Sequence, residues 1–221
     1  MNGCNMNTMA SGLCRVLAAA LLATLLSGCG RQAPQGPAWD FARVGADGAL
    51  QAAARADGHH CVLDRRTGLL WEVKRPAPAL HHADDLFSWH STDAAEHGGE
   101  PGLADGGTCG LARCDTDAFV AAVNEAGLCG RHDWRMPSRD EALTLLDVTR
   151  IGDGPALDPA YFPGAAEGEY WTGTTFRMYP RGAWAIDTIY AQDRVDWKVN
   201  LKRVRLVSGA RDAVRPKRRG R

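Results

Sequence analysis

The clearest hydrophobic periodicity in the chain lies between residues 116 and 126. Apolar side chains recur there at three- and four-residue spacing, at Phe119, Val120, Val123 and Ala126. Residues so spaced fall on one face of a helix, so this segment is predicted to be helical. Thr116 can cap its start, and Gly127 can end it, because a residue without a Cβ readily adopts the left-handed conformation of a helix end.

The residues after this helix predict a short strand and a second helix. Trp134 and Met136 alternate with a charged residue, which is the pattern of a strand with one buried face. Pro137 disfavours helix at the residue before it and so ends the strand. Ser138 and Glu141 have the spacing of a capping box, which indicates the start of the second helix.

Runs of β-forming residues predict an antiparallel sheet. Residues 61–73 form a hairpin around Gly68, and single strands are expected at 39–44 and 86–89. Further strands are expected at 170–172, 183–190, 195–199 and 204–207. The alanine-rich segment 49–56 could be helical, and 75–107 is a long irregular segment of the kind that is usually functional or mobile. The pattern predicts one α+β domain from 39 to 209.

The N-terminal region is predicted to be a targeting segment. Arg15 precedes an uncharged apolar run at 16–26, and Leu26-Ser27-Gly28-Cys29 resembles the bacterial lipobox. A signal peptide at 1–28, a lipid on Cys29 and a proline-containing tether at 29–38 are therefore expected. Gly at position 30 favours the outer membrane by the same resemblance. The alternative is a transmembrane helix, but the run is short of the roughly 20 residues that a span needs.

Charge adds one feature to this picture. Lys and Arg number 26, as do Asp and Glu, so the formal net charge is zero and gives no general argument for nucleic-acid binding. Six of the basic residues lie between Arg211 and Arg221, against one acidic residue. The segment 210–221 is predicted to be a disordered basic tail, which could lie on anionic lipid headgroups.

Four cysteines remain after the expected lipid site: Cys61, Cys109, Cys114 and Cys129. An even number in an exported domain predicts two disulfides, with three possible connectivities. Our preferred pairing is Cys109–Cys114, which closes a short loop, and Cys61–Cys129, which ties the early hairpin to the helix end. A four-thiolate zinc site is the alternative, although the spacing lacks paired C-x-x-C motifs.

An ordered set of short runs covers nearly all of the expected domain. The runs are Val62-Leu63-Asp64, Thr67-Gly68-Leu69, Trp71-Glu72, Cys114-Asp115-Thr116, Val123-Asn124, Leu128-Cys129-Gly130, Asp133-Trp134-Arg135-Met136-Pro137, Tyr161-Phe162-Pro163, Tyr170-Trp171-Thr172, Ala183-Trp184 and Arg205-Leu206-Val207. In this order they resemble the Lcl C-terminal domain family of bacterial envelope proteins. We take Trp71, Trp134, Arg135, Pro137 and Trp171 as its fold signature.

The resemblance implies a C-type-lectin-like fold, with a twisted antiparallel sheet, two helices and long irregular loops. It also implies an envelope location, and the best-studied relatives bind sulfated glycans and help attachment. The collagen-like repeat of the adhesin that names the family is not present in this sequence.

Several residue clusters are candidates for chemical sites. Histidines crowd one third of the chain and could ligate zinc or copper: His59, His60, His81, His82, His90 and His97. Loop carboxylates could offer oxygen ligands to calcium: Asp84, Asp85, Asp93, Glu96, Asp105 and Asp115. Neither set has a recognised ligand spacing, so we predict no metal and no cofactor. The run 134–137 is also similar to a segment of formylglycine-generating enzymes, but no cysteine nucleophile follows Cys129, and no enzymatic activity is expected.

The late strands carry the candidate binding residues. Lys202, Arg203 and Arg205 could share a basic face that meets sulfate or phosphate, and Trp184 and Trp197 could contact a sugar ring. Further basic residues are Arg177, Arg181, Arg194 and Lys198. The alternative is a solvated strand face.

These features predict a non-catalytic envelope lipoprotein with a lectin-like domain that binds an anionic glycan or a surface protein. A structural subunit of an envelope or pilus assembly is the alternative, and a metal-dependent enzyme is a weaker one. The expected partners are the membrane, through the lipid, and that glycan or envelope protein, with oligomerisation possible and no nucleic acid.

Overall fold

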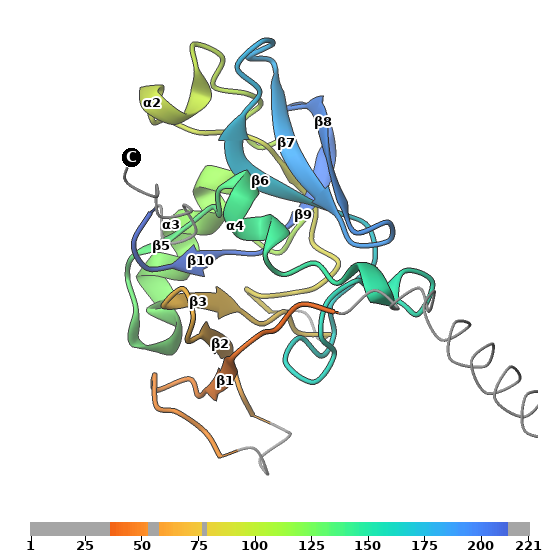
Figure 1. Ribbon diagram of the computed structural model, residues 1–221. Helices are drawn as coiled ribbons and strands as arrows, with labels where there is room; N and C mark the ends of the chain where they lie inside the picture. The colour runs from red at the N-terminus through yellow and green to blue at the C-terminus, as the bar shows by residue number, and fades with distance from the viewer. Residues whose placement is uncertain (1–35, 53–57, 77–78, 212–221) are drawn as a thin grey trace, which may run out of the picture. The chain divides into compact units, whose positions relative to one another are not determined.

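The computed structural model describes residues 36–52, 58–76 and 79–211, whose ten strands form two five-stranded sheets. The first sheet has the order β1 (Phe41–Val44), β2 (Cys61–Asp64), β3 (Leu69–Glu72), β10 (Val207–Ser208) and β5 (Trp134–Arg135). The second has the order β4 (Phe87–Ser88), β9 (Leu201–Val204), β6 (Glu169–Thr175), β7 (Gly182–Asp187) and β8 (Gln192–Trp197). All neighbours are antiparallel except β6 and β9, which are parallel. The α+β class is confirmed (Figure 1).

Three short α-helices accompany the sheets in the described part of the chain. They are α2 (Ala94–His97), α3 (Thr116–Ala126) and α4 (Arg139–Leu143), with 3₁₀ turns η1 (Leu128–Gly130) and η2 (Val148–Arg150). The predicted helix at 116–126 is confirmed, and Gly127 ends it with φ 64°. The prediction that Thr116 caps this helix is wrong, because the Asp115 side chain accepts the Ala118 N–H. Thr116 instead donates its hydroxyl to the His90 carbonyl.

The second predicted helix begins as expected and is only five residues long. The Ser138 hydroxyl accepts the Glu141 N–H, and the Glu141 carboxylate accepts the Ser138 N–H, which completes the capping box. Glu141 also receives two hydrogen bonds from the Arg135 guanidinium, at 2.8 Å each. Strand β5 is thereby fastened to the start of α4, which explains the role of this arginine in the fold signature.

The hairpin around Gly68 forms as predicted, with β2 and β3 paired in register and Gly68 at φ 75°. The prediction of one strand at 204–207 is wrong. Arg205 and Leu206 separate β9 from β10, and the two strands join different sheets. The Glu72 carboxylate accepts the Leu206 N–H at 2.9 Å, so this backbone donor has a partner although it lies between the two strands. In the alanine-rich segment, Leu50 forms an isolated antiparallel bridge with Val44, and residues 53–57 lie outside the described part.

The core consists of two clusters of buried side chains. One surrounds Phe87, Trp89, Phe119 and Trp171 beside the disulfide of Cys61, and the other surrounds Trp71. The tryptophans of the fold signature, Trp71, Trp134 and Trp171, are all almost fully buried. The Pro137 carbonyl accepts the Gly173 N–H at 2.7 Å. These residues are therefore part of the packed core.

Both disulfides follow the preferred pairing, with Cys61 bonded to Cys129 and Cys109 bonded to Cys114. The first joins β2 to the η1 turn across 68 positions, and the second closes a loop of five. The expected signal peptide, the lipid site at Cys29 and most of the predicted tether and basic tail lie outside the described residues. Among the residues that are described, no helix is long and apolar enough to cross a membrane.

Candidate functional site

The site is built on the hairpin of β7 and β8. Their register pairs Gly182 with Trp197 and Trp184 with Val195, and directly paired residues project from the same face of a sheet. Glycine contributes no side chain, so this face is hollowed above Gly182. The resulting depression has a volume of about 450 Å³ and is lined by Phe176, Tyr179, Gly182, Val195, Asp196 and Trp197. We call it the aromatic depression.

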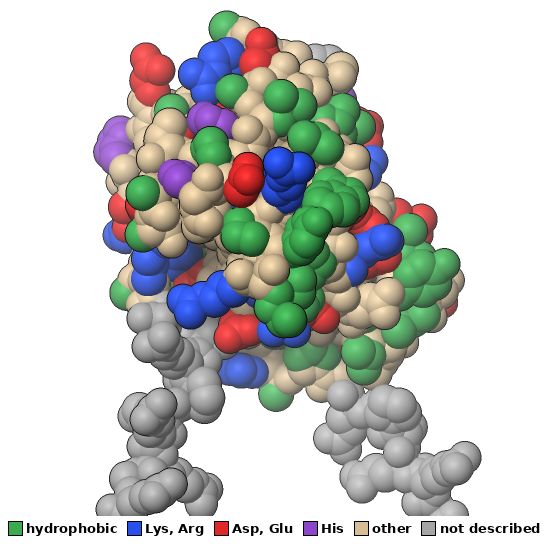
Figure 2. Space-filling model, turned by 90° about the horizontal axis from the view of Figure 1, so that it is seen from above, with side chains coloured by type: hydrophobic (Ala, Val, Ile, Leu, Met, Phe, Trp, Pro, Cys, Tyr) green, Lys and Arg blue, Asp and Glu red, His purple; other side chains and the backbone are tan. Residues whose placement is uncertain are grey.

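Two exposed rings form one wall of the aromatic depression. Tyr179 and Trp197 stand edge to face, with ring centroids 5.3 Å apart, and remain 55% and 49% exposed. Met178 and Val199, which lie close to these two residues in the sequence, are also exposed. Seen from the side on which β7 and β8 stand in Figure 1, hydrophobic side chains form a continuous run with basic and acidic ones beside it (Figure 2). Exposed apolar surface of this kind marks binding sites.

Glycine is required at the floor of the aromatic depression. A Cβ at position 182 would lie 2.9 Å from Cγ1 of Val195. Any larger residue would therefore push against β8.

Asp196 is the acidic group of the aromatic depression. Its carboxylate oxygens accept hydrogen bonds from other groups of the protein. Oδ1 accepts the Trp197 N–H and the Asn200 amide, each at 2.8 Å, and Oδ2 accepts Nζ of Lys202 at 2.5 Å. Burial alone would raise the pKa of Asp196, but these hydrogen bonds, led by that from Lys202, lower it. The carboxylate stays ionised and serves to orient the turn after Trp197.

The prediction that Lys202, Arg203 and Arg205 share an exposed basic face is wrong. Lys202 is buried and bridges Asp196 and Glu169. Arg205 is also buried, with Nη1 donating to the Glu72 carbonyl at 2.5 Å. Arg203 donates Nε to the Ala83 carbonyl and pairs with an exposed aspartate. These cations bind carboxylates and carbonyls of the domain, so they hold its elements together.

The two predicted sugar-contacting tryptophans do share a face. Trp197 is exposed, while Trp184 is half-buried, with the Arg139 guanidinium 4.3 Å from its ring centroid. Phe176 packs edge to face on Trp184 at 5.6 Å. The sequence reasoning missed Phe176 and Tyr179. Their signal was an aromatic pair in the short connection between two predicted strands, where polar turn residues are usual.

A second depression also borders Trp197. It measures about 330 Å³ and is lined by Glu100, Gly102, Arg181, Trp197, Lys198 and Val199. Arg181 is exposed and lies 3.5 Å from the Glu100 carboxylate. We call it the charged depression. Trp197 thus lines both depressions.

A family model for the Lcl C-terminal domain matches residues 60–208. The chain belongs to the Lcl C-terminal domain family. The match contains every residue of both depressions, so the site belongs to the Lcl C-terminal domain itself. The search of curated proteins found no match, and neither did the search of solved structures.

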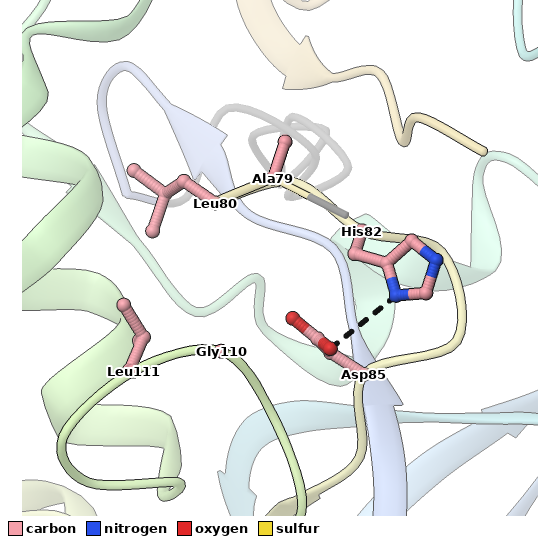
Figure 3. A pocket seen from close by; sticks show the side chains of 6 residues that line it. All are labelled: Ala79, Leu80, His82, Asp85, Gly110 and Leu111. Carbon is pink, nitrogen blue, oxygen red and sulfur yellow. Dashed lines mark hydrogen bonds and ion pairs between the residues drawn. The ribbon is translucent and has the colours of Figure 1, made fainter. Parts of the chain in front are cut away.

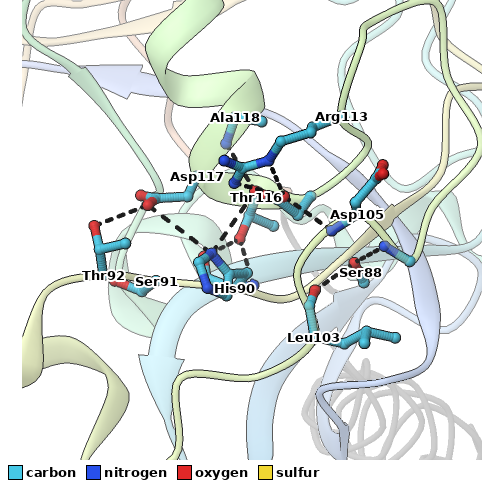
Figure 4. A network of polar contacts seen from close by, with 12 residues as sticks. Ser88, His90, Ser91, Thr92, Leu103, Asp105, Arg113, Thr116, Asp117 and Ala118 are labelled. Atoms are coloured by element: carbon cyan, nitrogen blue, oxygen red, sulfur yellow. Dashed lines mark hydrogen bonds and ion pairs between the residues drawn. The ribbon is translucent and has the colours of Figure 1, made fainter.

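A polar network holds the long loop of the Lcl C-terminal domain against α3 (Figure 4). Asp115 is its centre, accepting the N–H groups of Ala118 at 2.8 Å and Asp105 at 3.0 Å and the guanidinium of Arg113 at 2.9 Å. Burial would raise the pKa of Asp115, but these hydrogen bonds outweigh it and lower the pKa. The Ser88 hydroxyl donates to the Leu103 carbonyl at 2.7 Å. The network positions the loop that forms one side of the charged depression.

The histidines are dispersed among such local contacts. His59 bonds the Tyr161 carbonyl, His81 bonds the Glu72 carboxylate, and His97 accepts the Gly99 N–H. Within residues 36–52, 58–76 and 79–211, no three His, Cys, Asp or Glu side chains are arranged to hold a metal ion.

A further pocket of about 360 Å³ lies beside the short disulfide loop (Figure 3). His82 and Asp85 face each other on one side with Nδ1 and Oδ1 3.4 Å apart, and Leu80 and Leu111 lie on the other. Among the described residues, those that line it include no hydroxyl or thiol that this pair could activate.

Proposed function

We propose that this chain is an envelope lipoprotein whose Lcl C-terminal domain binds a glycan, without catalysis, through the aromatic depression. The observation that supports this most strongly is the pair of exposed rings, Tyr179 and Trp197, above a floor made by Gly182. Folding leaves this apolar surface in water although burying it would be favourable, which is the signature of a surface kept for a ligand.

A sugar ring suits this surface because it has an apolar face and a polar edge. The face can lie on the indole of Trp197, while hydroxyl groups reach solvent or the turn around Asp196. Arg177 and Arg181 flank Tyr179 in the sequence and are both exposed. Guanidinium groups form paired hydrogen bonds with sulfate or carboxylate, so a glycan carrying anionic groups fits better than a neutral one.

The proposal assigns no reaction to the site. Asp196 is the carboxylate of the aromatic depression, and its oxygens accept three hydrogen bonds from the protein. These hydrogen bonds stabilise the ionised carboxylate and lower its pKa, which makes it a poorer general base.

A second candidate is a structural subunit of an envelope or pilus assembly that makes a protein contact through the same surface. The exposed Met178 favours it, because flexible thioether side chains suit protein surfaces that adapt to one another.

The test is a glycan array followed by titration with a heparin hexasaccharide and its desulfated form. Trp197→Ala and Tyr179→Ala should each weaken binding at least tenfold. Tyr190→Ala is the matched control, because Tyr190 is 61% exposed and lies in the turn at the other end of the same hairpin. Loss of sulfate should weaken binding, and Arg181→Gln should remove most of that difference. Equal binding by all variants, or no binding of any glycan, would reject the proposal in favour of the structural candidate.

A further inference from the structure

Lys198 follows Trp197 in the sequence but points inward, and only 2% of it is exposed. Its Nζ donates to the Glu100 carbonyl at 2.6 Å and to the His97 carbonyl at 3.1 Å. The same nitrogen lies 3.9 Å from the ring centroid of Trp89, where a cation is attracted by the π-electrons. The ammonium therefore contacts the loop at 97–102 and the buried ring of Trp89.

The backbone of Lys198 joins further segments at the same point. Its N–H donates to the Arg181 carbonyl at 2.9 Å, and its carbonyl accepts the Trp89 N–H at 3.0 Å. The loop at 97–102 is held tightly here, since a Cβ at Gly102 would lie 2.0 Å from the Trp89 carbonyl oxygen. All the segments that line the charged depression thus meet at this lysine.

We propose that Lys198 is a positioning residue of the binding site, whose ammonium holds the loop at 97–102 as the wall of the charged depression beside Trp197. This inference rests on the proposed function only for its effect on the ligand. The arrangement of the wall itself can be tested without one.

The alternative role for a buried lysine is general support of the core, and Nζ does contact the core ring of Trp89, but both hydrogen bonds of the ammonium go to the loop at 97–102. The loop carries Glu100, which pairs with Arg181 across the depression. If the ammonium were removed, two carbonyls would lose a charged donor, and the loop would be free to move away from Trp197. Both the wall and the orientation of Arg181 toward an anionic group would change.

The charge of Lys198 makes the wall sensitive to pH. Burial lowers the pKa of Lys198 to about 8, and the carboxylate of Glu100 offsets this only in part. Other charged or titratable side chains on the segments that Lys198 contacts include Arg181, just before β7, Glu96 and His97 on α2, and His90 next to Trp89. A neutral amine donates weaker hydrogen bonds than an ammonium, so the wall should loosen above this pH.

The first measurement needs no ligand. The full-length protein is labelled with 5-fluorotryptophan, and its fluorine resonances are followed from pH 6 to 10. A tryptophan resonance should shift with a midpoint near pH 8, because Nζ lies over the ring of Trp89. Lys198→Arg keeps the charge and the donors but does not titrate in this range, so the same resonance should stay constant.

The second measurement is heparin-hexasaccharide affinity at pH 7 and pH 9. Affinity of the native protein should fall by up to about tenfold at the higher pH, which is the effect of losing a charge-assisted hydrogen bond. Lys198→Arg should bind with the same affinity at both, and Lys198→Met should bind weakly at both. An unchanged fluorine titration in Lys198→Arg, or equal pH dependence of its binding, would overturn the inference. Absence of any hexasaccharide binding would reject the proposed function, while the fluorine titration would still decide the role of Lys198.

Discussion

Glu72 offers the sharpest test of how the two sheets are joined. Its carboxylate is fully buried, with Oε1 2.8 Å from Nζ of Lys74 and 2.8 Å from Nδ1 of His81. Oε2 accepts the Leu206 N–H at 2.9 Å, where the chain passes from β9 to β10. Glu72→Gln keeps the shape of the side chain but removes its charge, so the buried ammonium of Lys74 loses its counterion.

The cost can be estimated in two ways. Removing one partner of a buried ion pair destabilises a protein by about 3–5 kcal/mol. Burial would raise the pKa of Glu72, but Lys74 and His81 lower it from 4.5 to about 2. That shift corresponds to about 3 kcal/mol of stability at neutral pH. Burial lowers the pKa of Lys74 despite its partner, so the desolvation of the lysine reduces the net value of the pair.

The direction of the pH effect follows from the lowered pKa of Glu72. Between about pH 4.5 and pH 2 the unfolded chain binds a proton that folded Glu72 does not. The contribution is therefore complete above pH 4.5 and is lost as the pH falls through this range. Glu72→Gln lacks this contribution, so its free energy of unfolding should fall less than that of the native protein on acidification.

The assay is urea unfolding followed by tryptophan fluorescence, with disulfides intact, at pH 7 and pH 3. Glu125→Gln, on the exposed face of α3, is the control and should change stability by less than about 0.5 kcal/mol. The double variant Glu72→Leu with Lys74→Met should recover part of the loss, because it removes both charges of the pair but leaves the Leu206 N–H without its acceptor. A loss below about 1 kcal/mol in Glu72→Gln at pH 7, or equal acid sensitivity in both proteins, would refute the reasoning.

Three further predictions concern other parts of the chain. Cys29→Ser should abolish incorporation of radiolabelled palmitate and move the protein from the membrane fraction to the soluble one, and retention of the label would contradict the lipid site. Replacing both cysteines of the disulfide between β2 and η1 by alanine should lower the free energy of unfolding by about 4 kcal/mol, against about 2 kcal/mol for the short-loop disulfide, because it closes a longer loop. Urea midpoints measure the difference, and equal losses would contradict the argument. Gly182→Ala should weaken hexasaccharide binding and cost roughly 1–3 kcal/mol of stability by crowding β8. Unchanged affinity in titration calorimetry would show that the ligand does not enter above this position.

Local signals in the sequence were enough for much of the scaffold. The helix end at Gly127, the capping box of Ser138 and Glu141, and the turn at Gly68 depend on residues a few positions apart, so their spacing alone predicts them. Asp115 took the cap expected of Thr116 because both side chains can accept at a helix start, and only the neighbouring loop, which engages Thr116, distinguishes them.

The binding surface depended on distant residues. The sequence predicted that Lys202 and Arg205 are exposed on a basic face, but both are buried. Lys202 binds the Glu169 carboxylate, 33 positions away, and Arg205 binds the Glu72 carbonyl, 133 positions away. A cation's burial depends on whether folding brings it a partner, and strand alternation carries no information on that. By itself, then, the sequence was enough to predict the α+β scaffold and to show the family resemblance, and it favoured one cysteine pairing among three, which the structure has. The tertiary structure alone decided which cations are internal and that Tyr179 joins Trp197 over Gly182, because both depend on contacts between segments that only folding brings together.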